Sequence, residues 1–135
     1  MGKTTIAEIV VARLADEGVA AEVIDGATLE AELGPAEPGA ALRRVVWLAA
    51  VLQRHGVLPV IAVAAPDRAA RDAAVAAIDG CVEVFVDGGA DPADFDAPIA
   101  PVVRVPTLDR APEASAAYLV SWWETAEESA AFRPE

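Results

Sequence analysis

The stretch Gly2-Lys3-Thr4-Thr5 decides the fold, because a predicted helix and then a predicted strand come directly after it. From Thr4 to Glu17 apolar residues recur at helical spacing, and Gly18 is placed to end the predicted helix. Ala21–Ile24 then predicts a short strand that ends at Asp25-Gly26. A helix that opens on a glycine-lysine-threonine turn and leads to a strand is the beginning of an alternating α/β chain.

The rest of the sequence continues this alternation. Predicted helices cover Thr28–Leu33, Ala40–His55, Asp67–Ile78 with Asp67 as its cap, and Pro112–Ser129 with Tyr118, Leu119 and Trp122 on one face; predicted strands cover Val57–Ala64, Cys81–Val86 and Val102–Val105. Turn residues predict loops at 34–39 and 88–101. Strands that alternate with helices of this length indicate right-handed βαβ units and a parallel sheet, and 135 residues suit one domain.

The composition excludes two classes of partner. A net charge of −12 with only ten Lys and Arg residues argues against nucleic acid and against an anionic membrane surface. The longest apolar stretch, around Val57–Pro66, is far shorter than the roughly 20 residues that span a bilayer. Cys81 is the single cysteine, so an intrachain disulfide cannot form, and we expect a cytoplasmic protein.

Gly2-Lys3-Thr4 matches the second half of the P-loop, in which backbone N–H groups and the lysine surround nucleotide phosphates and the hydroxyl holds Mg²⁺. On this interpretation Gly2, Lys3, Thr4 and Thr5 bind ATP, and Thr4 binds Mg²⁺ through its hydroxyl. The alternative is a flexible end of the chain in which a threonine caps the helix.

Five stretches in the same order make the chain similar to one family of P-loop kinases, the adenylylsulfate kinases. Their segments G-K-S/T-T, D-G-D, N-I-R-R, S-P-Y-R-A-x-R-D and Y-E-A-P correspond to Gly2-Lys3-Thr4-Thr5-Ile6-Ala7, Val23-Ile24-Asp25-Gly26-Ala27, Ala41-Leu42-Arg43-Arg44-Val45, Ala65-Pro66-Asp67-Arg68-Ala69-Ala70-Arg71-Asp72 and Phe95-Asp96-Ala97-Pro98. The resemblance implies a P-loop NTPase-like, three-layer α/β/α domain over residues 1–135.

The resemblance also assigns roles to residues. It implies that Lys3 and Asp25 are catalytic, with Asp25 near the acceptor hydroxyl, and that Arg43 and Arg68 bind substrate. For Asp25 the alternative is an Asp-Gly turn, for Arg43 a solvated helix face, and for Arg68 an ion pair with Asp67. His55, next to Gly56, is interpreted as a helix-end residue without chemistry.

Several positions depart from the family pattern. Ala27, Ala41, Ala65 and Asp67 replace polar or aromatic residues of the family's substrate side, and Glu30 stands where the family has an arginine. The segment between Asp87 and Asp94 is too short for the family's basic lid. A carboxylate in place of an arginine repels an anionic substrate.

The family's sheet has a central strand ahead of the P-loop, and this chain begins after it. We consider three explanations: the strand is supplied from elsewhere, the remaining strands close up, or translation starts upstream, which we favour. Without that strand, two rows of backbone groups lack partners.

Three functions therefore stay open. The first is an ATP-dependent phosphotransferase that acts on a nucleotide 3′-hydroxyl. The second is a catalytically inactive nucleotide-binding or interaction module, and the third is a kinase for a smaller or less anionic alcohol. A homodimer is the candidate assembly, with Trp122 and Trp123 in core packing or a dimer contact.

Overall fold

The computed structural model describes residues 3–63, 68–78, 80–81, 84–87, 103–106 and 111–131. Helices and strands alternate through these residues, as the sequence predicts. In chain order they are α1 (Lys3–Asp16), β1 (Ala21–Asp25), α2 (Gly26–Leu33), α3 (Pro38–Arg54), β2 (Leu58–Ala62), α4 (Arg68–Ala77), β3 (Val84–Asp87), β4 (Val103–Pro106) and α5 (Pro112–Ala131). The predicted cap Asp67 and the predicted loop at 88–101 lie outside the described residues.

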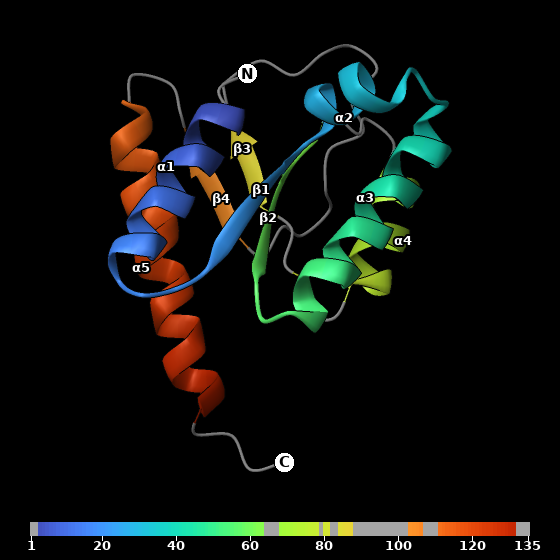
Figure 1. Cartoon of the computed structure of the whole chain (residues 1–135). Helices are drawn as coiled ribbons and strands as arrows, with labels where there is room; N and C mark the ends of the chain where they lie inside the picture. The colour runs from blue at the N-terminus through green and yellow to red at the C-terminus, as the bar shows by residue number, and fades with distance from the viewer. Residues whose placement is uncertain are drawn as a thin grey trace.

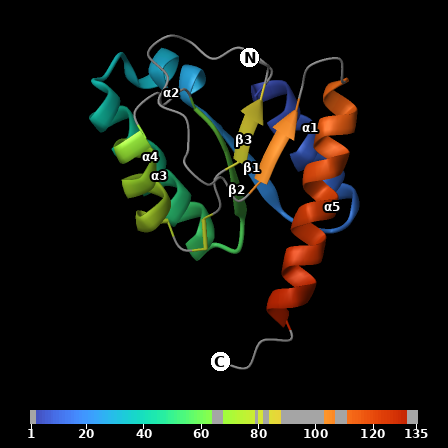
Figure 2. The same cartoon turned by 180° about the vertical axis from the view of Figure 1, so that it is seen from behind.

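The elements form three layers. Helices α1 and α5 pack together on one side of the strands, and α3 and α4 lie on the other side (Figures 1 and 2). The short helix α2 follows directly after β1. This arrangement confirms the predicted α/β/α layering.

All strand pairs of the described chain are parallel, which confirms the expected βαβ connection between β1 and β2. Strand β1 pairs with β2 from Ala21↔Leu58 to Asp25↔Ala62, and β3 pairs with β4 from Val84↔Val103 to Asp87↔Pro106. The strands form two sheets of two strands each. Since β2 does not pair with β3, the described strands have not closed up into one continuous sheet.

The core consists of two apolar clusters, one on each side of the strands. Ile6, Val10 and Leu14 recur every four residues on α1 and meet Ala116 and Val120 of α5, which gives the first cluster. The second cluster contains Ile24 of β1 with Val45, Ala49 and Ile78. The exposed fraction is 1% for Leu14 and 2% for Ile24, so each cluster contains a fully buried side chain.

Strand β2 is only partly buried although its sequence is almost entirely apolar. Leu58–Ile61 are half-buried and Ala62 alone is buried, despite contacts of β2 with α1 and α3. The reason is that β2 has a described neighbour on only one of its edges. An apolar strand paired on both edges and covered on both faces loses more of its exposed surface.

Most element ends follow the sequence signals, but α3 begins earlier than predicted and β3 begins at Val84, three residues after the predicted start at Cys81. Gly18 and Gly56 have φ of 81° and 73°, the left-handed conformation expected after α1 and α3. Helix α3 begins at Pro38 instead of Ala40, because proline is well suited to the first turn of a helix.

The predicted face of the last helix is wrong in part. Tyr118 is 47% exposed, whereas Ser115, Ala116 and Val120 are buried and Trp123 packs against the first cluster. Each residue turns the helix by about 100°, so the contact with α1 selects a face that excludes Tyr118. None of the described helices is long and apolar enough to cross a membrane.

Candidate functional site

The first turn of α1 meets the end of β1 at one pair of side chains. The hydroxyl of Thr4 donates to Oδ1 of Asp25 across 3.4 Å, although the residues are 21 positions apart. At that distance the hydrogen bond is long for an O–H···O contact. The structure thus brings together two of the residues that the sequence singles out.

Asp25 also begins the next helix. It is the N-cap of α2, with extended φ and ψ of −103° and 120°. Its Oδ1 accepts from the backbone N–H of Ala27 at 3.2 Å, and its Oδ2 accepts from the hydroxyl of Thr28 at 2.9 Å. Asp25 is therefore a helix cap and a contact of the α1 turn at once.

Lys3 and Thr4 are half-buried at the start of α1, and Thr5 is exposed. Gly2 lies outside the described residues. The first turn of α1 contains no acidic residue. Since its first N–H groups have no partner within the helix, this turn offers donors and a lysine charge to an anion.

The predicted substrate-binding arginines are not brought to Asp25 by any hydrogen bond within the described part of the chain. Arg43 is exposed on α3, where its guanidinium lies beside Gly39 of the same helix. Its neighbour Arg44 donates from Nη1 to the carbonyl of Gly34 at 2.8 Å and holds the loop between α2 and α3. Arg68 is half-buried at the start of α4 and has an interaction partner.

A hollow of about 220 Å³ opens beside Asp25. Its polar lining comes from Glu8 of α1, Asp25 and Thr28, and its apolar lining includes Val23 and Leu48. Glu8 follows Thr4 by one helical turn, so both face the same side of α1. Among the described residues, the lining contains two carboxylates and no basic side chain, which disfavours a strongly anionic occupant.

Three of the departures from the family pattern lie in α2 and α3. Ala27 and Glu30 lie in α2, on the exposed surface, and Ala41 is exposed in the first turns of α3. Ala65, Asp67 and the short segment from 88 to 94 lie outside the described residues. His55 caps the end of α3 through its backbone N–H, as the sequence predicts.

Two residues of the site were not predicted. Thr28 completes the set of donors to Asp25, and Glu8 adds a second carboxylate to the hollow. The signal for Thr28 was available, because a threonine three residues after an aspartate cap is placed to reach back to it. Glu8 could have been found from its spacing of four residues after Thr4.

The side-chain groups of Thr4 and Asp25 offer oxygen atoms to a ligand. A hydroxyl, a carboxylate and a helix N-terminus with a lysine are what a magnesium-bound phosphate requires. Among the described residues, no three carboxylate, histidine or cysteine side chains gather into a metal site. Mg²⁺ typically keeps several waters and uses one or two protein oxygens together with substrate phosphates, so Thr4 and Asp25 fit that mode.

Solved structures share this fold. The APS kinase CysC Cys556Ala mutant of Mycobacterium tuberculosis is 25% identical, with a TM-score of 0.77 over 91% of this chain and 89% of that one. The structure of the same kinase in complex with AMPPNP and APS, 22% identical, gives 0.79 over 91% of each chain. A hexameric APS kinase from Thiobacillus denitrificans gives 0.77 over 93% of this chain and 27% of that one.

Sequence comparison agrees with the structural comparison. The adenylyl-sulfate kinase of Paraburkholderia xenovorans is 39% identical over 93 residues, and that of Microcystis aeruginosa is 33% identical over 92, each covering 64% of this chain. The chain spans about half the length of these curated relatives, 52% and 51%. The model of the adenylylsulphate kinase family matches residues 1–94. The chain therefore belongs to the adenylylsulphate kinase family.

Proposed function

We propose that this chain, as a single domain over residues 1–135, is an ATP-dependent phosphotransferase of the adenylylsulfate kinase type. In this proposal ATP binds at the start of α1 and a hydroxyl-bearing acceptor binds beside Asp25. The observation that carries it is the contact of Thr4 with Asp25, which joins the phosphate-binding turn to the end of β1. Ligands of open α/β sheets bind at the carboxyl ends of the strands, where Asp25 lies.

Binding of the nucleotide rests on the first turn of α1. Gly2 lets the backbone approach the phosphates, and Lys3 supplies a positive charge to them. Thr4 and Thr5 add backbone N–H groups and hydroxyls at the same helix end. Family membership supports this assignment, since a relative with the same fold was solved in complex with AMPPNP and APS.

The oxygens of Thr4 and Asp25 fit Mg²⁺. Both are hard oxygen ligands, and they lie in hydrogen-bond contact at 3.4 Å. If bound there, Mg²⁺ would supply positive charge to the phosphates during phosphoryl transfer. The hydroxyl of Thr4 is the protein atom that we assign to it.

Asp25 is the residue that we assign to the acceptor hydroxyl. Its carboxylate accepts from three donors, and an ionised carboxylate has about four acceptor positions, so one position on Oδ2 remains for the acceptor. The donors also fix its orientation, which positions a general base. We assign Arg43 and Arg68 to the anionic part of a substrate.

A kinase for a smaller or less anionic alcohol is the second candidate. The hollow beside Asp25 measures about 220 Å³, below the range of about 300–1,000 Å³ usual for sites of drug-sized ligands. Glu8 lines this hollow, and Glu30 lies on α2, two residues after Thr28. Two added carboxylates favour a neutral acceptor over adenylylsulfate.

The third candidate is the catalytically inactive nucleotide-binding module. It is supported by the contact that Arg44 already makes within the chain. Arg44 is committed to Gly34, and the exposed Ala27 and Ala41 offer no polar contact in place of the family's residues. We place all three functions in the cytoplasm, where the single thiol of Cys81 stays reduced.

Measuring ATP consumption with adenylylsulfate and with a panel of neutral alcohols separates the candidates, with Asp25→Asn as the matched control. Turnover with adenylylsulfate that is lost in the control supports the first proposal. Turnover only with neutral alcohols selects the second candidate. Nucleotide binding without turnover of any acceptor selects the module and contradicts the kinase proposal.

A further inference from the structure

Glu8 lines the hollow beside Asp25, and its carboxylate has no partner in the described part of the chain. It follows Thr4 by one turn of α1, and its side chain is exposed. Within the described residues Glu8 makes no hydrogen bond or ion pair, whereas Asp25 accepts from three donors. The carboxylate of Glu8 is therefore available to a molecule bound in the hollow.

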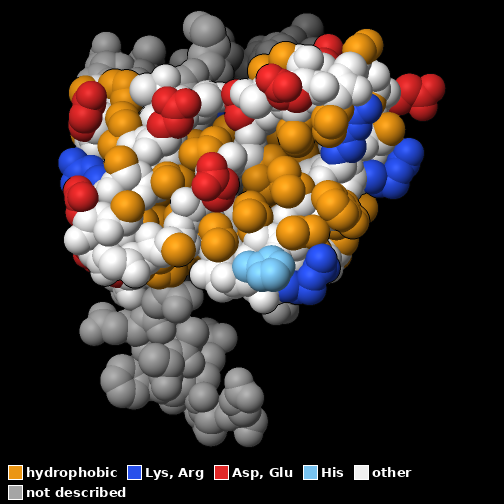
Figure 3. Space-filling model, in the orientation of Figure 1, with side chains coloured by type: hydrophobic (Ala, Val, Ile, Leu, Met, Phe, Trp, Pro, Cys, Tyr) orange, Lys and Arg blue, Asp and Glu red, His pale blue; other side chains and the backbone are white. Residues whose placement is uncertain are grey.

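The arginines of α3 do not neutralise the hollow, although Leu48 of this helix lines it. The guanidinium of Arg43 lies beside Gly39, and Arg44 donates to the carbonyl of Gly34 at 2.8 Å. Figure 3 shows hydrophobic side chains gathered over α3, with Lys and Arg side chains at both ends. Among the described residues, the charged lining thus consists of two carboxylates alone, which favours an occupant with a positive charge.

The remaining lining suits a small molecule with a hydrocarbon body. Val23 and Leu48 add apolar surface to this hollow of about 220 Å³. Side chains one helical turn apart have Cβ atoms about 5–6 Å apart, and Thr4, one turn before Glu8, lies in contact with Asp25. A molecule of a few carbon atoms is therefore long enough to reach both carboxylates.

We propose that Glu8 is a specificity-determining residue of this site and that the acceptor is a compact amino alcohol. The inference rests on the proposed phosphotransferase function and narrows its second candidate to one class of substrate. The hydroxyl of the acceptor meets Oδ2 of Asp25, and its ammonium group donates to the carboxylate of Glu8. Its carbon atoms contact Val23 and Leu48.

The ammonium group selects the acceptor and takes no part in the transfer. The acceptor oxygen forms a bond to the γ-phosphorus of ATP, and the bond from that phosphorus to the β,γ-bridging oxygen breaks. ADP leaves, and the proton of the acceptor hydroxyl passes to Asp25. A change at Glu8 therefore acts on the binding of the acceptor, and so on KM, more than on kcat.

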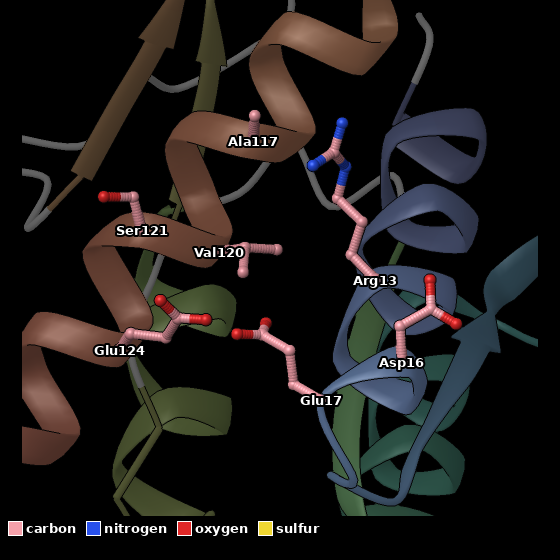
Figure 4. Close-up of a pocket in the computed structure, with 7 residues that line it drawn as sticks. All are labelled: Arg13, Asp16, Glu17, Ala117, Val120, Ser121 and Glu124. Atoms are coloured by element: carbon pink, nitrogen blue, oxygen red, sulfur yellow. The ribbon is translucent and has the colours of Figure 1, made fainter.

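A second hollow supplies the matched control. It measures about 380 Å³ and lies between the end of α1 and α5, and Figure 4 shows Asp16 and Glu17 among the residues that line it. A helix rises 1.5 Å per residue, so the end of α1 is about 20 Å from the turn at Lys3 and Thr4. Glu17→Gln thus removes the same charge as Glu8→Gln without reaching the candidate site.

ATP consumption by the whole chain is measured with three acceptors of similar size: serinol, which carries an ammonium group, glycerol, which is neutral, and glycerate, which is an anion. We expect a KM for serinol about fivefold lower than that for glycerol, the factor typical of an exposed ion pair. Glu8→Gln should remove this difference, and Glu17→Gln should keep it. Glu8→Lys reverses the charge and should make glycerate the acceptor with the lowest KM.

Binding without ATP separates this inference from the proposed function. NMR titration of the whole chain with serinol and with glycerol gives their dissociation constants in the absence of turnover. Tighter binding of serinol that Glu8→Gln abolishes, with no turnover of any acceptor, supports the role of Glu8 and contradicts the kinase proposal. Turnover with equal KM for serinol and glycerol, or a preference for serinol that survives Glu8→Gln, overturns the role of Glu8 and leaves the kinase proposal standing. Absence of both binding and turnover overturns both.

Discussion

The hydroxyl of Thr4 lies 3.4 Å from Oδ1 of Asp25, and this contact links the first turn of α1 to the cap of α2. One carboxylate therefore organises three segments: the end of β1, the start of α2 and the turn at Thr4. Any change at Asp25 acts on stability and on the candidate site together. The effect on stability and the effect on the site can be separated by comparing a substitution that keeps the side-chain oxygen with one that removes it.

Asp25→Ala should lower the free energy of unfolding by about 1–2 kcal/mol, because the N–H of Ala27 and the hydroxyl of Thr28 lose their acceptor. Asp25→Asn keeps a side-chain oxygen in the same place and should cost much less. Urea denaturation of both variants measures the difference. Equal losses would mean that capping is not what Asp25 contributes to stability.

Thr4→Val should weaken magnesium-dependent nucleotide binding by at least about tenfold, which corresponds to about 1.4 kcal/mol. Valine keeps the shape of threonine but removes the hydroxyl that we assign to Mg²⁺. Thr4→Ser, which keeps the hydroxyl, is the matched control and should bind nearly as the wild type does. Titration calorimetry with and without Mg²⁺ gives both affinities, and a Thr4→Val variant with unchanged affinity contradicts the assignment.

Arg44→Met should reduce the free energy of unfolding by about 1–3 kcal/mol, because the half-buried carbonyl of Gly34 loses its 2.8 Å donor. The neighbouring Arg43→Met removes an exposed arginine and should change stability by less than about 0.5 kcal/mol. Thermal unfolding followed by circular dichroism compares the two. The interpretation of Arg44 as a loop anchor fails if both variants unfold alike.

Leu14→Ala should cost about 2–5 kcal/mol of stability, since this side chain is 1% exposed in the cluster between α1 and α5. Leu33→Ala is the control, because Leu33 is 60% exposed at the end of α2. Denaturant titration should show a large change in midpoint for the first variant and a small one for the second. A small change for Leu14→Ala would contradict the packing of α1 on α5.

Glu30→Arg tests whether charge on α2 excludes adenylylsulfate. Replacing this exposed carboxylate by a cation should tighten adenylylsulfate binding by about tenfold or more, if the residue faces the bound anion. Glu32→Arg makes the same change of charge two residues further along α2 and should have a weaker effect. Equal gains for the two variants would show a general effect of net charge and no specific contact.

The sequence predicted the fold well where local chemistry decides it. Apolar spacing in α1 and α3 and the left-handed glycines Gly18 and Gly56 placed helix ends within a few residues. The pair Asp25-Gly26 correctly ended β1. These features depend on residues that are close in the chain, so periodicity and turn chemistry suffice.

Features that depend on distant partners were harder to predict. The buried face of α5 is selected by Leu14 and its neighbours on α1, which the pattern around Tyr118 does not reveal. The division of the strands into two sheets reflects pairing between remote segments. The contact of Thr4 with Asp25 joins residues 21 positions apart, and no local pattern in the sequence predicts it.

Calorimetric titration of Mg·ATP into the folded chain and into its Lys3→Ala variant tests the central claim most directly. If the first turn of α1 binds nucleotide phosphates, the wild type should bind Mg·ATP and the variant should bind at least about tenfold more weakly, because the lysine charge is lost. Absence of binding to the folded wild type, or equal affinity of both proteins, would contradict a phosphate site at Lys3 and Thr4.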